Sequence, residues 1–408
     1  MIVKIKEEIK VTGNVNAAPA EAVATKRSES PKKHWRVPSG TVRAYGMVAA
    51  LVLMWVIFSV VTNGIFLEPR NFSNLIRQAA VTGIISVGMV MVIVTGQIDL
   101  SVGSLVGLAG MAAILVQYYW HWGLILSLCT ALVIGLMVGA LQGWLTAYGK
   151  IPSFIVTLGG LLAWRGVAKG ISQGATYPIE VRSFRDLGQA YLGRSVGLAL
   201  VAVTVVAVIW SVLHRNSMRK RHGLPPWSVA ALSLRIMLPS VLAVGFVFAL
   251  NAYAGVPVPV LILVVVALSG AFLTESTVFG RHLYAIGGNP EAARFSGINL
   301  RSQVLIAFAI LGVLTAIAAV IYTARVGSAG PDAGTLLELD AIAACVIGGA
   351  SLAGGRGTVL GACLGALFMA SLDNGMSLKN VPDFVQDVIK GGILVAAVGF
   401  DVMGKRRE

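Results

Sequence analysis

Charged side chains are scarce in this sequence. Asp, Glu, Lys and Arg together account for 12% of its 408 residues, whereas a soluble domain usually carries about 25%. Apolar residues reach 56%, which is more than one water-surrounded core of this size can bury. The shortage of charge therefore excludes an ordinary soluble protein and indicates a chain that crosses a membrane several times.

The sequence is also poor in residues that bind metals or form disulfides. Its three cysteines, Cys129, Cys345 and Cys363, lie inside apolar runs and lack disulfide or metal spacing. Its five histidines show no pairing at the spacing of metal ligands. We therefore expect no metal site and no cofactor in this chain.

A phosphate-binding loop is absent as well. Such a loop needs a glycine, four residues, then Gly-Lys followed by Ser or Thr. In "GWLTAYGKI" the first glycine, Gly143, is one residue too far from Gly149, and Ile151 replaces the hydroxyl residue. No pairing of nucleophile and base stands out elsewhere. We expect neither an ATPase site nor an enzyme, which also leaves an integral membrane enzyme without support.

Long apolar runs dominate what is present. Runs of about 17–25 residues are typical of membrane-spanning helices, and the sequence offers twelve candidates, some of them short. They cover residues 44–62, 75–95, 100–119, 123–148, 152–171, 196–213, 229–252, 256–274, 303–323, 339–352, 358–372 and 384–402. The sequence thus predicts an all-α polytopic membrane helical bundle with about 10–12 transmembrane helices, some broken or short.

The domain organisation follows from these runs. Residues 1–43 are rich in Ala, Pro, Ser, Lys and Glu, a composition that predicts a disordered basic cytoplasmic tail. We expect residues 44–403 to form a single transmembrane domain, and residues 404–408 to form a cytoplasmic C-terminal tail. A polar connection is expected at residues 372–384.

Basic residues outnumber acidic ones by 14, but their positions argue against nucleic-acid binding. They gather in the N-terminal tail and in short loops, where Lys and Arg set membrane orientation. With the tail inside, counting crossings places residues 214–224, residues 279–302 and the C-terminus inside too. Arg182, Arg185 and Arg194 fall outside and are exceptions to this rule.

Glycines recur at every fourth position in two apolar runs. Small residues at that spacing let helix backbones approach closely in lipid. We predict that these glycines pack helices within the chain, in preference to forming a dimer face. The predicted helix-packing residues are Gly135, Gly139, Gly143, Gly361 and Gly365.

Two segments interrupt the apolar runs. "TGQIDLSVGS" places Gln97, Asp99 and Ser101 between two runs without room for a loop. Asp99 either caps the following helix or lines a polar cavity, because a carboxylate at membrane depth needs partners. "GGASLAGGRGTVLG", in the other half of the chain, contains too many glycines for a helix interior. Paired interruptions of this kind indicate a transport path.

A charged stretch, "GGNPEAARFSG", separates two apolar runs on the predicted inner side, within the loop at residues 279–302. Asn289 and Pro290 can begin a helix as cap and first residue, and Glu291 suits its first turn. Gly297 can end it. We therefore predict a short surface helix at residues 290–296.

The wider motif "YAIGGNPEAARFSGI" resembles the Glu-Ala-Ala loop of binding-protein-dependent ATP-binding-cassette (ABC) importer permeases. Together with "GQIDLSVGS" and "GGASLAGGRGTVLGA", it looks like the ribose/xylose branch of sugar importer permeases, from about Phe72 to the C-terminus. The additional stretch at residues 215–254 is more like the xylose permeases.

The resemblance implies a site and partners. Its ATPase-docking residues would be Asn289, Glu291, Ala292, Ala293, Arg294 and Gly297. Residues that line or gate the sugar path would be Gln97, Asp99, Ser101, Gly354, Gly355 and Gly357. The expected partners are a cytoplasmic ABC ATPase that uses ATP, a periplasmic sugar-binding protein and a second permease copy, in the lipid bilayer of the bacterial inner membrane. The expected substrate is a monosaccharide, D-xylose or a similar pentose.

One hypothesis from another class stays open. An ion-coupled secondary transporter also needs an interrupted helix and a membrane-depth carboxylate, and Asp99 would be its coupling residue.

Overall fold

The computed structural model describes residues 39–405, and the side chains of residues 46–399 within them. The α-helices are α1 (Ser39–Val61), α2 (Pro69–Val94), α3 (Val102–Trp120), α4 (Leu124–Ala147), α5 (Ser153–Ser172), α6 (Arg182–Gln189), α7 (Arg194–Arg221), α8 (Val229–Asn251), α9 (Val258–Ser276), α10 (Val278–Gly288), α11 (Pro290–Phe295), α12 (Leu300–Val326), α13 (Leu337–Ile347), α14 (Val359–Leu378) and α15 (Asp383–Lys405). A 3-10 turn, η1 (Ile65–Leu67), and four strands of two residues, β1 (Tyr177–Pro178), β2 (Tyr191–Leu192), β3 (Val256–Pro257) and β4 (Ser328–Ala329), complete the described part.

Nine of the described helices are long and apolar enough to cross a membrane, namely α2 to α5, α7 to α9, α12 and α14. At 11 residues, α13 is about 16 Å long and too short to span a hydrocarbon core of roughly 30 Å. These features confirm the predicted all-α polytopic bundle with short or broken members.

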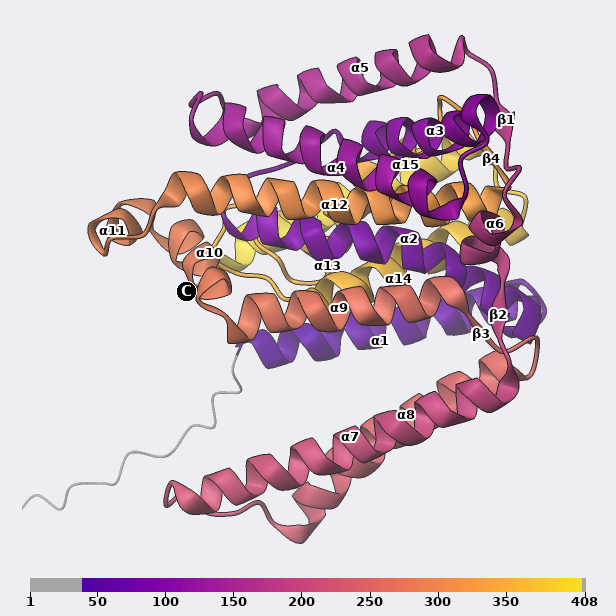
Figure 1. Cartoon of the computed structure of the whole chain (residues 1–408). Helices are drawn as coiled ribbons and strands as arrows, with labels where there is room; N and C mark the ends of the chain where they lie inside the picture. The colour runs from indigo at the N-terminus through magenta and orange to yellow at the C-terminus, as the bar shows by residue number, and fades with distance from the viewer. Residues whose placement is uncertain (1–38, 406–408) are drawn as a thin grey trace, which may run out of the picture. The chain divides into compact units, whose positions relative to one another are not determined.

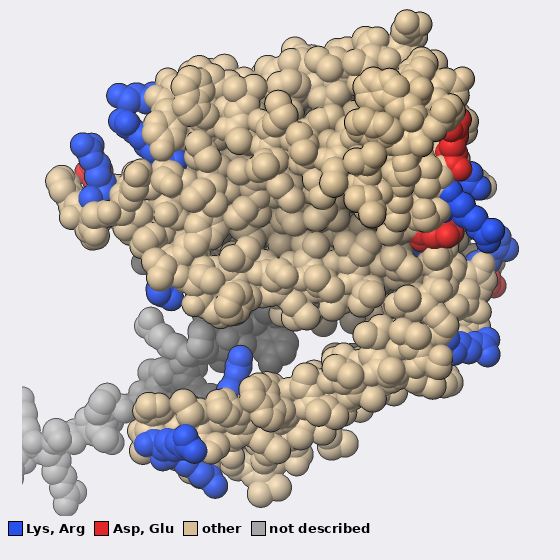
Figure 2. Space-filling view, viewed as in Figure 1, with Lys and Arg blue, Asp and Glu red and all other residues tan. Residues whose placement is uncertain are grey.

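The helices run between two ends (Figure 1). At one, which we call the strand end, β1 pairs with β4 and β2 with β3, both antiparallel. At the other, the α11 end, lie α10 and α11. Charged side chains gather at the two ends on the face shown in Figure 2, and the belt between them is almost free of charge. This distribution is the one that a bilayer-spanning domain requires.

The core is built around α2. Every residue from 79 to 94 is buried, because α9, α12, α13 and α14 all pack against this helix. A helix that is apolar on all sides fits such a surrounded position.

Close glycine contacts hold neighbouring helices together. A β-carbon at Gly135 would collide with the Gly312 carbonyl of α12, and one at Gly139 with the Phe308 carbonyl. On α14, Gly361 and Gly365 lie in the same way against the backbone of residues 344 and 348. Gly143 also faces α12, with the Leu305 Cα 2.9 Å from its β-carbon position. The glycine ridges thus lie against helices of the same chain.

Helices α7 and α8 form a hairpin that packs chiefly on itself. It begins after β2 and ends before β3, so its turn lies away from the strand end. The turn carries Trp227, whose ring faces the Arg235 guanidinium at 4.1 Å and that of Arg219 at 5.5 Å. Basic residues beside an aromatic anchor are typical of a membrane–water boundary.

The ends of the described helices differ by a few residues from some of the predicted segment boundaries. The predicted tail at residues 1–43 lies mostly outside the described residues, but α1 already begins at Ser39. The C-terminal tail was placed from residue 404, whereas α15 continues to Lys405. The polar connection at 372–384 is shorter than expected because α14 continues to Leu378. Its polar residues have partners: Asp373 pairs with Lys390, and Asn374 exchanges hydrogen bonds with Asn71.

Candidate functional site

The predicted surface helix is α11, which ends one residue earlier than expected. The Asn289 side-chain oxygen accepts a hydrogen bond from the Ala292 N–H at 3.0 Å, and Pro290 is the first helical residue. At the other end, Gly297 has a φ of +82°, a conformation that favours glycine. The Ile298 N–H then donates to the Ala293 carbonyl at 3.1 Å. Asn289 therefore caps the start of α11 and Gly297 reverses the chain at its end, as the sequence predicted.

Most of α11 is open to a partner. Glu291, Ala292 and Arg294 are exposed, and Ala293 alone is buried in this helix. Sequence reasoning missed Phe295, whose exposed fraction is 89%. No other large apolar side chain in the described part of the chain is as exposed. In the sequence, the only feature that could have pointed to Phe295 is its position within the charged motif.

Helix α10 connects α11 to the interior. Leu283 and Ile286 bury its inner face, and the Tyr284 hydroxyl donates to the Gly357 carbonyl at 2.7 Å. This bond joins α10 to the second predicted break.

At the first break, the buried Asp99 carboxylate organises the backbone. Its Oδ1 accepts hydrogen bonds from the backbone N–H and the hydroxyl of Ser101, both at 2.7 Å. The prediction that Asp99 caps the next helix was wrong. The residue that precedes α3 is Ser101, and Asp99 instead closes the turn before it.

Two residues that sequence reasoning missed complete this network. In the amide orientation that gives each atom a partner, Gln142 Nε2 donates to Asp99 Oδ2 at 3.1 Å. Its Oε1 accepts from the Trp164 indole N–H at 2.9 Å. The first break is thus joined to α4 and α5 by hydrogen bonds. A lone glutamine in the apolar run of α4 was the available signal.

The second break, between α13 and α14, is held by backbone contacts. The Gly355 N–H donates to the Val94 carbonyl at the end of α2, at 2.8 Å. Gly354 has a φ of +86°, and a β-carbon there would lie 2.9 Å from the Gly287 Cα and 3.0 Å from the Gly96 nitrogen. Only glycine satisfies both the conformation and the space.

These contacts bring three distant segments together. A β-carbon at Gly287, near the end of α10, would collide with the Val94 carbonyl and the Gly355 nitrogen. The end of α10, the end of α2 and the second break therefore meet backbone to backbone. We call this contact of Val94, Gly287, Gly354 and Gly355 the glycine junction. This junction places both breaks next to α10, the helix that directly precedes α11.

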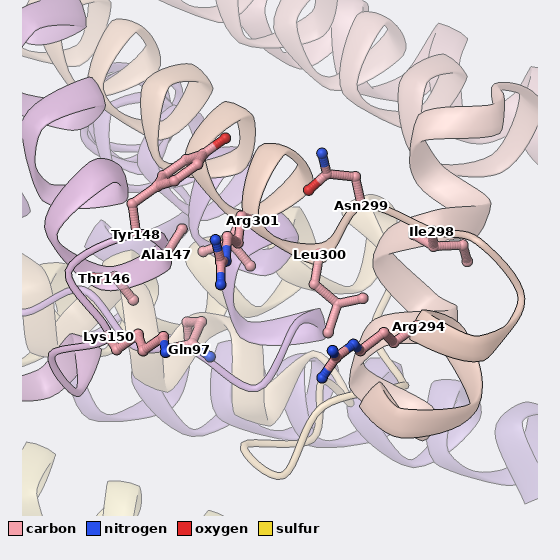
Figure 3. A pocket seen from close by; sticks show the side chains of 11 residues that line it. Gln97, Thr146, Ala147, Tyr148, Lys150, Arg294, Ile298, Asn299, Leu300 and Arg301 are labelled. Carbon is pink, nitrogen blue, oxygen red and sulfur yellow. The ribbon is translucent and has the colours of Figure 1, made fainter.

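A cleft of about 690 Å³ opens beside α11 (Figure 3). Its lining includes Gln97 from the first break, Lys150 from the α4–α5 connection, Arg294 of α11 and Arg301 in the first turn of α12. None of its lining residues is acidic. Gln97 thus faces an open basic cleft. Asp99 and Ser101, in contrast, are buried in the hydrogen-bond network with Gln142.

Known transport proteins resemble this chain over most of its length. The family model that matches, over residues 71–218 and 227–398, is described as "Branched-chain amino acid transport system / permease component". The gap between the two matches falls on the turn of the α7–α8 hairpin.

Among curated proteins, the xylose transport system permease protein XylH of Escherichia coli (strain K12) is 47% identical over 367 residues, which cover 90% of this chain and 93% of that protein. The protein of the same name from Haemophilus influenzae is 46% identical, with 91% and 100% covered. The ribose import permease protein RbsC of Escherichia coli (strain K12) is 32% identical, with 87% and 92% covered. No solved structure matches the chain. With most of its length matched, this multi-pass membrane protein belongs to the family of transport-system permease components.

Proposed function

We propose that this chain is the permease subunit of an ABC importer in the bacterial inner membrane, and that it translocates D-xylose or a similar pentose. The observation that carries the proposal is the glycine junction, because it connects an exposed docking helix to both breaks in the bundle. The names of the 46–47% identical relatives support the choice of substrate.

The proposed energy source is a separate ATPase that docks on α11. Phe295 offers an apolar ring for a groove in that subunit, flanked by the exposed Glu291 and Arg294. Movement of α11 passes to α10, whose buried face and Tyr284 bond resist bending. From α10 the movement reaches the Val94 end of α2 and the second break through direct backbone contact.

The complete importer in this proposal contains two permease copies, two ATPase copies or one double ATPase, and a periplasmic sugar-binding protein. ATP is hydrolysed by the ATPase alone, and this chain carries no cofactor. Gln97, Asp99, Ser101, Gly354, Gly355 and Gly357 line or gate the path, and Gln97 faces the cleft through which sugar leaves.

The surroundings of Asp99 support the importer over an ion-coupled transporter. A coupling carboxylate must exchange protons or ions with an open path. Asp99 is 3% exposed, and both of its oxygens have hydrogen-bond partners.

Phe295→Ala tests the docking proposal. We expect normal membrane abundance, a loss of most co-purifying ATPase, and a matching loss of xylose uptake, because a large interface aromatic contributes about 2 kcal/mol or more. Phe384→Ala is the matched control, since Phe384 is also exposed, at 71%, but lies at the start of α15. Equal ATPase retention in the two variants would contradict docking on α11.

A further inference from the structure

The cleft beside α11 is lined by three basic side chains that come from three different segments. Lys150 follows α4, Arg294 belongs to α11, and Arg301 lies in the first turn of α12. In Figure 3, Lys150 and Arg294 extend into the cleft from opposite sides, and Arg301 lies between them. None of the three forms an ion pair with a residue in the described part of the chain. We call Lys150, Arg294 and Arg301 the basic cluster.

Contacts within the fold position two of these cations. The Arg301 guanidinium lies over the Tyr148 ring, 5.9 Å from its centroid, and this cation–π contact restricts its rotation. Lys150 has a φ of +57° where the chain reverses after α4, and the Ile151 N–H then donates to the Leu145 carbonyl at 3.4 Å. The end of α4 therefore holds both cations beside the same cleft.

The lining offers charged hydrogen-bond donors but no charged acceptor. Lys and Arg side chains donate hydrogen bonds and accept none, and the lining contains no carboxylate. The hydroxyls of a free sugar are donors as well as acceptors, so a neutral sugar leaves the cations of this lining without a counter-charge. A phosphate monoester carries a charge of about −1.5 to −2 at pH 7, and its oxygens are strong acceptors. The lining therefore suits a phosphate group better than a free sugar.

The cleft has room for a phosphate group with a small organic part. Its volume of about 690 Å³ lies in the range of about 300–1,000 Å³ that is usual for small-molecule sites. The Gln97 amide, which can donate to and accept from a hydroxyl, is part of the same lining. Of the proposed ATPase-docking residues, only Arg294 lines the cleft, and Phe295 does not. The cleft is thus largely separate from the surface that is proposed to dock the ATPase.

We propose that the basic cluster binds the phosphate group of a small phosphorylated polyol, such as a sugar phosphate, at the α11 end of the bundle. The organic part of this ligand lies over Gln97 and obstructs the exit of the transported sugar. Phosphate binding is independent of the proposed function, whereas the obstruction rests on it. Sugar phosphates are products of phosphoryl transfer to free sugars, so the site lowers import when phosphorylated product accumulates.

The probe for this site is D-ribose 5-phosphate, with D-ribose as its uncharged counterpart. Isothermal titration calorimetry measures their binding to the purified full-length permease in a neutral detergent. Arg301→Gln and Lys150→Gln each remove one cation of the basic cluster. Arg281→Gln is the matched control, because Arg281 belongs to α10 and does not line the cleft. All three positions are exposed, so the variants should fold normally.

We expect the wild type and Arg281→Gln to bind D-ribose 5-phosphate and not D-ribose. Arg301→Gln and Lys150→Gln should each weaken this binding by about tenfold or more, because each removes a charge-assisted hydrogen bond. Equal measurable affinity in Arg301→Gln and Arg281→Gln overturns the site.

An anionic lipid headgroup offers the same phosphate chemistry. Native mass spectrometry of the same variants with added phosphatidylglycerol distinguishes this source. Retention of this lipid by Arg281→Gln and its loss from Arg301→Gln, without binding of D-ribose 5-phosphate, would keep the phosphate site and overturn its soluble ligand. If neither ligand binds in a way that depends on Arg301, the site is overturned.

Uptake of D-xylose by proteoliposomes that contain permease, ATPase and loaded binding protein tests the obstruction. On the ATPase side, D-ribose 5-phosphate should inhibit the wild type and Arg281→Gln, and about tenfold more of it should be needed to inhibit Arg301→Gln. Without the probe, all three should take up D-xylose equally. Binding to the permease without inhibition of uptake overturns the obstruction.

Co-purification of the ATPase separates this site from the docking surface. Arg301→Gln should retain the ATPase as well as Arg281→Gln does. Loss of the ATPase from Arg301→Gln alone, with no phosphate binding to the wild type, would assign the cleft to the ATPase and overturn the site. Absence of uptake by the wild-type complex would instead overturn the proposed function, while the binding of D-ribose 5-phosphate to the permease alone would still stand.

Discussion

The two breaks in the bundle are held by different means. At the first, the Asp99 side chain binds Ser101 and Gln142, so polar side chains supply the partners that the backbone and carboxylate need. At the second, Gly354 and Gly355 bring the backbone against Gly287 and Val94 with no side chain between them. Hydrogen-bonded side chains can rotate when the segments that they join shift slightly. Backbones in direct contact cannot, so a shift of one segment displaces the other. The second break is thus suited to pass on movement, and the first to hold a polar surface.

The largest expected effect tests the backbone contact. Gly354 and Gly349 both have positive φ, +86° and +93°, but a β-carbon at Gly349 meets nothing within 4 Å. Gly354→Ala and Gly349→Ala should therefore share a strain of about 1–2 kcal/mol. Gly354→Ala should add about 1–3 kcal/mol from overpacking. The unfolding midpoints of the purified variants in detergent measure the difference, and equal midpoints would show that the junction is loose.

The next effect concerns the side chains of the first break. Asp99→Ala removes the acceptor of the Ser101 N–H, and an unsatisfied buried donor costs about 1–3 kcal/mol. The Ser101 hydroxyl can still donate to Gln142 Oε1 at 2.7 Å. Asp99→Asn keeps an oxygen in place and should unfold nearer to the wild type. The same thermal unfolding measurement compares them.

Asp99→Asn also separates the two transport hypotheses. In the complete importer, its uptake should continue with ATP and remain insensitive to a protonophore. A variant that is present at normal membrane levels but has lost proton-driven uptake would favour the ion-coupled transporter.

The smallest effect on stability tests the connection between α10 and the second break. Tyr284→Phe removes one hydrogen bond, to the Gly357 carbonyl, which is worth about 0.5–1.5 kcal/mol. We expect a small shift in unfolding but a clear drop in ATP hydrolysis stimulated by loaded binding protein. Tyr253→Phe, at the strand end near β3, is the control. If both variants keep full stimulation, the Tyr284 bond plays no part in transmission.

Local chemistry made much of this protein predictable. The α11 helix depends on neighbours in sequence: Asn289 caps it, Pro290 begins it and Gly297 reverses the chain. Twelve apolar runs similarly predicted the membrane bundle, because each helix must satisfy its own backbone in lipid. The glycine ridge at Gly135 and Gly139 was visible as a spacing, although its partner, α12, was not.

The sequence by itself therefore determined where helices form and where they break, since hydrogen bonding and hydropathy act over a few residues. Only the tertiary structure decided what the breaks contact. Gln142 and Trp164 approach Asp99 from two other helices, and Gly287 meets Gly354 across 67 residues of chain. Asp373 falls in the predicted polar connection, and only the structure pairs it with Lys390 of α15. Such pairings depend on how helices dock, and no local pattern encodes the docking because lipid-facing and helix-facing surfaces are equally apolar.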